Sequence, residues 1–194
     1  MNPPSSHSIR GLVYASMLGA ATAAGAYIIV PVPPVPITLQ TLFMALAAVL
    51  LGARLGALSQ VVYVLLGLIG LPVFAGGKAG LGVLLGPTGG YLVGFVAGAY
   101  VTGFLIDRMT RPGALRIALA VAIGYLVVYV PGVIQLSLVA DLSMLQAITV
   151  GALPFLVGDA LKTATVVLVA PKVLRHARLG GNPGKGLSRG RLRA

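Results

Sequence analysis

Two ionisable residues, Asp159 and Lys162, lie inside the apolar stretch FLVGDALKTATVVLVAP at residues 155–171. The chain of 194 residues has only three acidic residues in all. Residues three apart share one face of a helix, so we expect these two side chains to point the same way. A carboxylate accepts hydrogen bonds and an ammonium group donates three. Together they would suit a small ligand that carries N–H donors and a carbonyl or carboxylate.

A purely structural ion pair is the alternative interpretation of the same two residues. One charge near the centre of a bilayer costs about 2.5 to 3.5 kcal/mol, and each partner would lower that cost for the other. An apolar pair would avoid the cost altogether, and ionisable residues in membrane spans commonly mark functional sites. Asp159 also falls near the start of its expected helix, which favours an anion there, and Gly158 would let a ligand approach the backbone.

The composition of the chain indicates which elements must position this pair. The sequence is 58% hydrophobic and 9% charged, with a mean hydropathy of +1.01, whereas soluble domains carry roughly 25% charged residues. We therefore expect an all-α integral membrane protein. The absence of cysteine excludes disulfides and thiolate metal sites. Neither His7 nor His176 has a partner at ligand spacing, so no metal and no cofactor are expected.

Six apolar stretches are candidates for membrane-spanning helices. They run over residues 12–30, 38–51, 55–71, 90–106, 116–136 and 155–173. Residues 142–153 could form an interfacial helix or the early part of a longer last span. A signal peptide that ends near residues 21–23 is a rival interpretation of the first stretch. We expect one membrane domain over residues 1–174 and a basic, disordered tail over residues 175–194.

The distribution of lysine and arginine predicts the orientation of the six spans. The basic residues on one side of the six-span arrangement are Arg10, Arg54, Arg108, Arg111, Arg116 and those from Lys172 onward, while the other side holds Lys78 and Asp141. Both termini should therefore be cytoplasmic. The net charge of +11 does not indicate nucleic-acid binding, because no aromatic residues are interleaved with the basic tail.

Two segments on the predicted outer side have unusual compositions. Residues 30–38, VPVPPVPIT, contain four prolines, which favour a stiff extended path that could be a simple connector or a lid. The long loop 70–91 between the third and fourth spans is rich in glycine yet apolar. Irregular backbone near a membrane must be buried in protein or line a cavity, so we expect it to fold back as a cap. A phosphate loop is excluded, because Pro72 and Ala79 stand where that motif needs glycine and a hydroxyl residue.

The first span carries small residues at four-residue spacing along two lines. One line contains Ala15, Gly19 and Ala23, and the next contains Ser16, Ala20 and Ala24. Small residues let helices approach closely in lipid. The sequence leaves open whether these lines serve packing within the bundle or docking to another membrane subunit.

Several of these motifs together resemble the BioY family, the biotin-specific substrate-binding (S) components of energy-coupling factor transporters. They are PVPPVPITLQTL, LGARLGALSQ, GLPVFAGG, GPTGGYL and PFLVGDALK, and in this order they cover nearly the whole chain between the tails. The resemblance implies a bundle of six helices that binds biotin near the outer face, beneath the first and third loops. It also implies a bacterial cytoplasmic membrane protein whose partners are a transmembrane coupling subunit and two ATPases, and it leaves open a homo-oligomer.

The resemblance also implies roles for particular residues. Asp159 and Lys162 match the acid and base of the family motif GDxxK; Asp159 would accept from the ureido N–H groups, and Lys162 would donate to a ligand oxygen. Lys78 would attract the ligand carboxylate, and Gln40 and Tyr91 would line the cavity. Ala20 and Ala24 fit the family's A-x-x-x-A coupling motif, although Ala15, Gly19 and Ala23 form a competing line.

We expect no covalent chemistry, because the chain has no plausible pair of nucleophile and base and no carboxylate dyad. Two other functions compete with the S-component hypothesis. A stand-alone secondary transporter would use the Asp159–Lys162 pair for proton coupling, although the sequence has no evident inverted repeat. An intramembrane enzyme would act on an apolar substrate.

Overall fold

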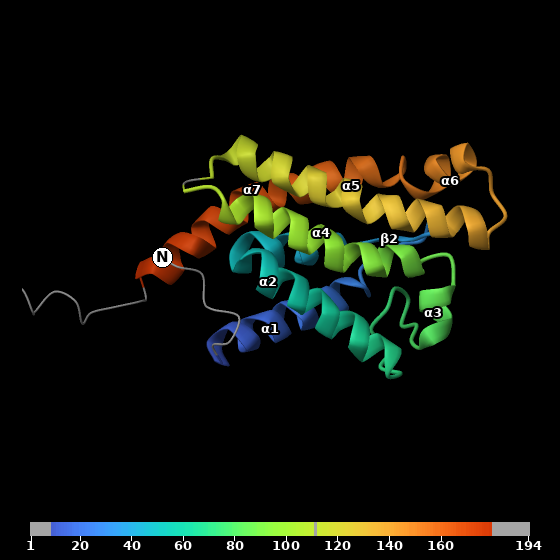
Figure 1. Ribbon diagram of the computed structural model, residues 1–194, viewed down its shortest axis with the longest axis horizontal. Helices are drawn as coiled ribbons and strands as arrows, with labels where there is room; N and C mark the ends of the chain where they lie inside the picture. Colours follow the sequence, from blue (N-terminus) through green and yellow to red (C-terminus); the bar gives the residue numbers. More distant parts are fainter. Residues whose placement is uncertain (1–8, 111, 180–194) are drawn as a thin grey trace, which may run out of the picture.

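The computed structural model describes residues 9–110 and 112–179, and the side chains of the last helix as far as Val173. The helices are α1 (Ile9–Gly25), α2 (Gln40–Leu68), α3 (Leu81–Leu85), α4 (Gly89–Asp107), α5 (Ala114–Val139), α6 (Met144–Gly151) and α7 (Phe155–Leu179). Strands β1 (Ile29–Val30) and β2 (Ile37–Thr38) pair as a short antiparallel hairpin between α1 and α2. The long helices pack side by side, with α4 between α2 and α5 and with α1 against α2 (Figure 1).

Helix α2 consists of two halves that meet at Gly52. The backbone of Gly52 is not helical (φ 81°, ψ −175°), and a positive φ of this kind favours glycine. The chain turns sharply there and brings its two halves together. A β carbon at Gly56 would lie only 2.8 Å from the Cα atom of Ala48, eight residues earlier. The backbone N–H of Ala53 donates a hydrogen bond (2.9 Å) to the carboxylate of Asp107 at the end of α4. The sequence predicted separate spans over 38–51 and 55–71, but the break between them is confined to Gly52.

Three of the described helices, α2, α4 and α5, are long and apolar enough to cross a membrane. The pair α6 and α7 would add a fourth crossing if it were counted as one span bent by 45°. Residues 142–153, which the sequence left open, thus contain a separate helix, and its start is fixed by a capping box between Ser143 and Gln146. Helix α7 begins at Phe155 and continues to Leu179, beyond the expected domain end at 174. The rest of the predicted tail, residues 180–194, and His7 lie outside the described residues.

The described basic residues divide between the two ends of the molecule. The start of α1, the end of α4, the start of α5 and the far end of α7 lie at one end, and α3 and α6 lie at the other (Figure 1). Arg10, Arg116 and Lys172 belong to the first end by their positions in these helices, as does Arg108 directly after α4. Lys78 precedes α3 at the second end. Arg54 joins the first group, because Ala53 next to it contacts the end of α4.

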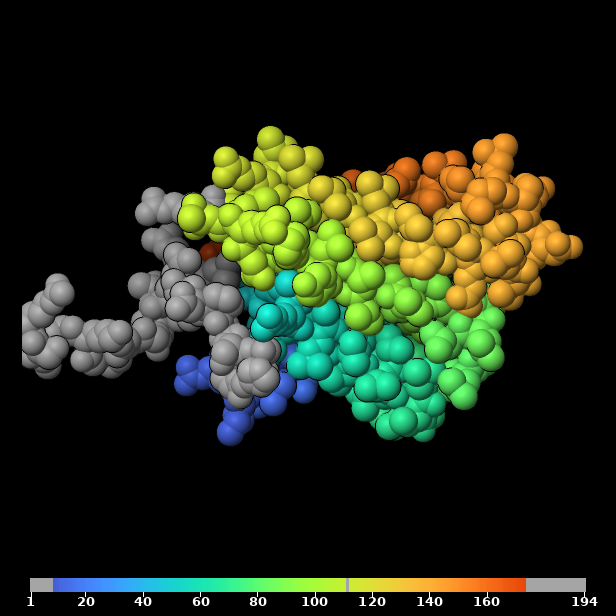
Figure 2. Space-filling view, in the orientation of Figure 1, coloured from blue at the N-terminus to red at the C-terminus, as the bar shows by residue number. Residues whose placement is uncertain are grey.

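The segment 70–88, which we call the cap, packs back onto the helices. Its Phe74 is almost fully buried (1% exposed) and meets the ring of Tyr63 edge to face at 5.7 Å. The phenyl ring fills the space above Gly67, where a β carbon would lie 2.1 Å from its Cζ atom. The backbone N–H of Gly80 also donates to the carbonyl of Gly67 (2.7 Å). In Figure 2 the green surface of this region lies at the end of the molecule that also carries the orange surface around α6.

Candidate functional site

A single pocket collects all five residues that the sequence singled out as ligand contacts. Asp159, Lys162, Lys78, Gln40 and Tyr91 all line it. The pocket lies between the proline-rich hairpin, the cap and helices α2, α4, α5 and α7. Residues far apart along the chain therefore meet in one cavity near the end of the bundle that carries α3 and α6.

Asp159 and Lys162 form a buried ion pair at the inner wall of this pocket. The Lys162 ammonium lies 2.9 Å from a carboxylate oxygen of Asp159, and the two residues are only 7% and 6% exposed. Lys162 also donates a hydrogen bond to the hydroxyl of Thr41 (2.8 Å), and Thr41 lies 3.4 Å from the carboxylate. The hydroxyl of Tyr129 donates to the other carboxylate oxygen. The pair is thus neutral as a unit and is held by partners from two other helices, Thr41 of α2 and Tyr129 of α5.

The start of α7 presents the pair to the pocket. Pro154 comes directly before the helix, a position that suits a residue without a backbone N–H. Asp159 follows about one turn later, and Lys162 lies three residues beyond it on the same face. A β carbon at Gly158 would meet only Ile37 of the hairpin, at 3.7 Å. Gly158 thus faces β2, so the open backbone expected there adjoins the hairpin.

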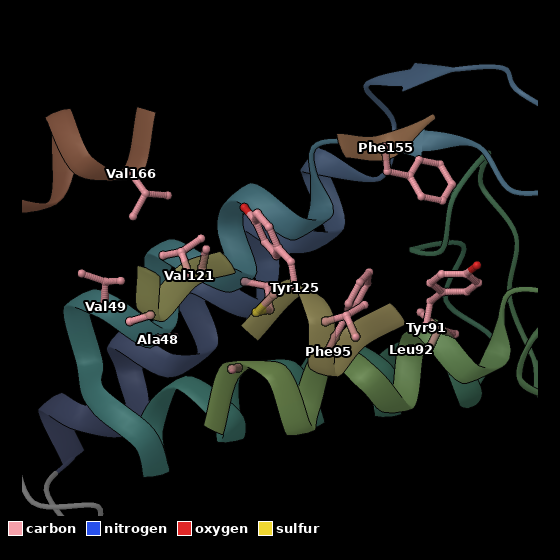
Figure 3. Close-up of a cluster of buried hydrophobic side chains, with 14 of the residues drawn as sticks. Ala48, Val49, Tyr91, Leu92, Phe95, Val121, Tyr125, Phe155 and Val166 are labelled. Atoms are coloured by element: carbon pink, nitrogen blue, oxygen red, sulfur yellow. The ribbon is translucent and has the colours of Figure 1, made fainter. Parts of the chain in front are cut away.

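Aromatic and aliphatic side chains form the rest of the wall. Phe155 stacks with Tyr129 (6.2 Å between ring centroids) and meets Tyr91 edge to face (6.3 Å). Figure 3 shows Tyr91, Leu92 and Phe95 projecting from α4 within the same buried cluster as Phe155. The hydroxyl of Tyr91 donates to the carbonyl of Gly151 (2.7 Å), which ties α4 to the end of α6. Tyr91 therefore offers its ring to the pocket while its polar end is already engaged.

Gln40 lines the pocket, but its amide is occupied by protein partners. Its oxygen accepts a hydrogen bond from the hydroxyl of Thr38 (2.7 Å), and its nitrogen donates to the hydroxyl of Tyr63. The ring of Tyr63 in turn packs against Phe74 of the cap. Gln40 thus connects the hairpin to the cap through Tyr63, and this role was not evident from the sequence.

Lys78 lies at the mouth of the pocket rather than at its inner wall. It belongs to the cap, its side chain is exposed, and its backbone bridges to Phe74. Within residues 9–110 and 112–173, the structure has one ion pair, between Lys162 and Asp159. Lys78 therefore has no anionic partner among these residues. The pocket therefore has a paired charge at one end and a free positive charge at the other.

Thr41, Tyr129 and Phe155 are pocket residues that the sequence analysis did not identify. Thr41 and Tyr129 are uncharged residues in apolar stretches, and a threonine hydroxyl in a helix commonly bonds to its own backbone. Thr41 comes directly after Gln40 in the motif PITLQTL, and Phe155 precedes the GD pair by only a few residues. Proximity to these motifs was the only indication available, and Tyr129 had none.

The two lines of small residues on α1 face different surroundings. Ala15 and Gly19 are buried, and a β carbon at Gly19 would lie 2.8 Å from the carbonyl oxygen of Ser59 in α2. Ala20 and Ala24 are exposed. The first line therefore packs inside the molecule, and the second remains available on its outer surface.

Comparisons with known proteins agree on one family. The family model described as BioY family matches residues 1–179. The biotin transporter BioY of Thermotoga maritima is 43% identical over 162 residues, which cover 84% of this chain and 94% of that protein. The probable biotin transporter BioY of Lysinibacillus sphaericus is 39% identical over 180 residues, covering 88% of this chain and 91% of that protein. The crystal structure of an S-component for biotin from an ECF-type ABC transporter is also similar. It has a TM-score of 0.81 and 28% identity, and the match covers 88% of this chain and 94% of that one.

Proposed function

This chain belongs to the BioY family, and we propose on that basis that it takes up biotin as the substrate-binding component of an energy-coupling factor transporter. It is a multi-pass membrane protein and a transporter component rather than an enzyme. The observation that carries the proposal is the neutral donor–acceptor set of Asp159, Lys162, Thr41 and Tyr129 beside aromatic walls. Biotin combines a ureido ring, an apolar bicycle and a carboxylated chain, which such a pocket would suit.

Within the pocket, we place the ureido ring against the ion pair. Asp159 would accept from the ureido N–H groups, and Lys162, with Thr41 beside it, would face the carbonyl oxygen. The bicycle would pack against Phe155 and Tyr91. The carboxylate would then point to Lys78 at the mouth of the pocket, where this lysine has no anionic partner among the described residues. Tyr91 and Gln40 would shape the cavity, because their polar groups are already bonded to protein.

We further propose six crossings of a bacterial cytoplasmic membrane, with both termini in the cytoplasm. The sharp turn at Gly52 supports two crossings by the halves of α2, and the clustering of Arg10, Arg54, Arg108 and Arg116 at one end supports the orientation. The exposed line of Ala20 and Ala24 on α1 would pack against a transmembrane coupling subunit that carries two ATPases.

Biotin binding to the detergent-purified chain tests the proposal directly. We expect stoichiometric binding with biotin recovered unaltered, and an absence of binding would refute the function. Uptake into proteoliposomes that also contain the coupling subunit and its ATPases should require ATP and resist a protonophore. Uptake by the chain alone that collapses with a protonophore would instead support a secondary transporter. Ala24→Trp should abolish co-purification with the coupling subunit while biotin binding is retained, because Ala24 is exposed and lies outside the pocket.

A further inference from the structure

A second cavity, of about 350 Å³, adjoins the pocket at its outer end. Pro34, Lys78, Val83 and Thr88 line both cavities, so these residues form their common boundary. Beyond the boundary, the second cavity is lined by cap residues such as Gly82 and Gly86. It contains neither member of the buried ion pair and none of the aromatic residues of the pocket.

The boundary between the cavities is formed partly by a movable side chain. Lys78 is exposed, and within the described residues it has no anionic partner that fixes its position. A lysine ammonium on a flexible stem can turn aside while it still neutralises a nearby anion. The wall at this place is therefore not a packed core, and a group longer than a carboxylate could pass it.

The polarity of the pocket determines which end of the ligand reaches this boundary. The hydrogen-bonding set of Asp159, Lys162, Thr41 and Tyr129 lies at the inner wall, and Lys78 lies at the mouth. A ligand whose ureido head occupies the inner wall must direct its carboxyl end toward Lys78. Any group joined to that carboxyl would then enter the second cavity, whose lining is mainly proline, glycine and aliphatic residues.

We propose that the second cavity is a subsite for groups attached to the carboxyl end of biotin, so that this chain also binds amides of biotin with small primary amines. The inference rests on the proposed function, because it assumes that the ureido head binds at Asp159 and Lys162. An amide has no negative charge and loses the attraction to Lys78. It keeps every contact of the head and bicycle, and its alkyl chain gains the apolar lining of the second cavity.

Gly82 offers a way to fill the second cavity selectively. A β carbon at Gly82 would meet no atom within 4 Å, and its φ is not in the positive range, so a side chain there is compatible with α3. Gly82 lines the second cavity but not the pocket. Leu85 is on the same helix, is 73% exposed and lines neither cavity, which makes Leu85→Phe a matched control for Gly82→Phe.

The experiment compares biotin with biotin n-butylamide by isothermal titration of the full purified chain. We expect wild-type protein and Leu85→Phe to bind the amide about fivefold more weakly than biotin, since an exposed ion pair contributes little. Gly82→Phe should bind biotin as wild type does and the amide at least about tenfold more weakly. Lys78→Ala should weaken biotin binding about fivefold and leave the amide unchanged.

Two outcomes would overturn the inference while biotin binding, and with it the proposed function, stands. One is wild-type protein that binds biotin but refuses the amide, and the other is Gly82→Phe that binds both as wild type does. Should Gly82→Phe lose biotin as well, Ala79→Leu replaces it, because Ala79 also lines only the second cavity. Loss of amide affinity alone in that variant supports the subsite, and equal behaviour toward both ligands refutes it. Wild-type protein that fails to bind biotin refutes the proposed function, and this inference with it.

Discussion

Removing the charges of Asp159 and Lys162 one at a time and together separates a structural ion pair from a ligand-binding one. Lys162 is only 7% exposed, and Asp159→Leu would leave its ammonium with Thr41 as the remaining hydrogen-bond acceptor. Breaking a buried pair from one side costs about 3–5 kcal/mol, whereas replacing both partners with apolar residues is often neutral or stabilising. At about 2–4 °C per kcal/mol for a chain of this size, each single variant should lower Tm by about 10 °C. The double variant Asp159→Leu/Lys162→Met should melt near wild type.

Biotin affinity should not follow stability in the variants of Asp159 and Lys162, because the double variant should be as stable as wild type and yet bind biotin weakly. Hydrogen bonds to charged groups contribute about 1.5–3 kcal/mol each. Losing the contacts of both side chains would therefore weaken binding about 10²- to 10⁴-fold, at 1.4 kcal/mol per factor of ten. The double variant should thus be stable and yet bind biotin poorly. Thermal melting and isothermal titration on the same detergent preparations measure the two quantities.

A control variant and a refuting result complete this test. Thr165→Val lies on the same helix, is exposed, and removes only a hydrogen bond to the carbonyl of Leu161 (2.9 Å), so neither Tm nor affinity should change much. A stable double variant with wild-type affinity would refute the reasoning. In that case Asp159 and Lys162 would serve only to neutralise each other, and the ligand would bind elsewhere.

Three further substitutions test the elements around the pocket. Gly67→Ala places a β carbon 2.1 Å from the phenyl ring of the cap, so we expect a loss of about 1–3 kcal/mol in stability and faster biotin release in stopped-flow measurements. Gln135→Leu removes the amide that donates to the carbonyls of Leu84 (2.7 Å) and Gly86 (2.8 Å); faster amide hydrogen exchange in α3 should result, and unchanged exchange would contradict this. Asp107→Ala removes the acceptor of the Ala53 N–H and should cost about 0.5–2 kcal/mol in a thermal melt with biotin affinity unchanged, because Asp107 does not line the pocket.

The parts of the site that the sequence predicted are those whose residue types are energetically unfavourable in their local sequence. A charged pair in an apolar stretch is improbable without a function or a partner, and the spacing of Asp159 and Lys162 settles that they share a helix face. The proline-rich segment 30–38 and the glycine-rich cap likewise indicate irregular backbone from their composition, and both segments line the pocket. The family resemblance supplied the predictions for Lys78, Gln40 and Tyr91. The polar groups of Gln40 and Tyr91 are bonded to protein, whereas the Lys78 ammonium has no anionic partner among the described residues.

The parts that the sequence did not predict depend on contacts between distant residues. Tyr129 lies 30 positions before Asp159, and nothing in its local sequence shows that the two meet. Asp107 is acidic and was still overlooked, because its role at Ala53 exists only when the end of α4 lies beside Gly52. Gly52 itself is one glycine among 27, and only the structure, through the positive φ of Gly52 and the close approach of Gly56 to Ala48, shows that the chain reverses at this residue.

The partners of the ion pair also affect how selective the pocket can be. A site that leaves a buried polar group unpaired rejects a ligand that lacks the matching group about 10⁴- to 10⁵-fold. Here the carboxylate of Asp159 keeps Lys162 and Tyr129 as hydrogen-bond donors when the pocket is empty. An analogue without ureido N–H groups would lose its own bonds but would leave no unpaired charge behind. Such an analogue should therefore lose affinity only through its missing hydrogen bonds to Asp159, roughly 10- to 100-fold for each bond. Because Asp159 and Lys162 satisfy each other, neither charge depends on a ligand for a partner, and this limits how strongly the polar end of the pocket can reject a wrong ligand.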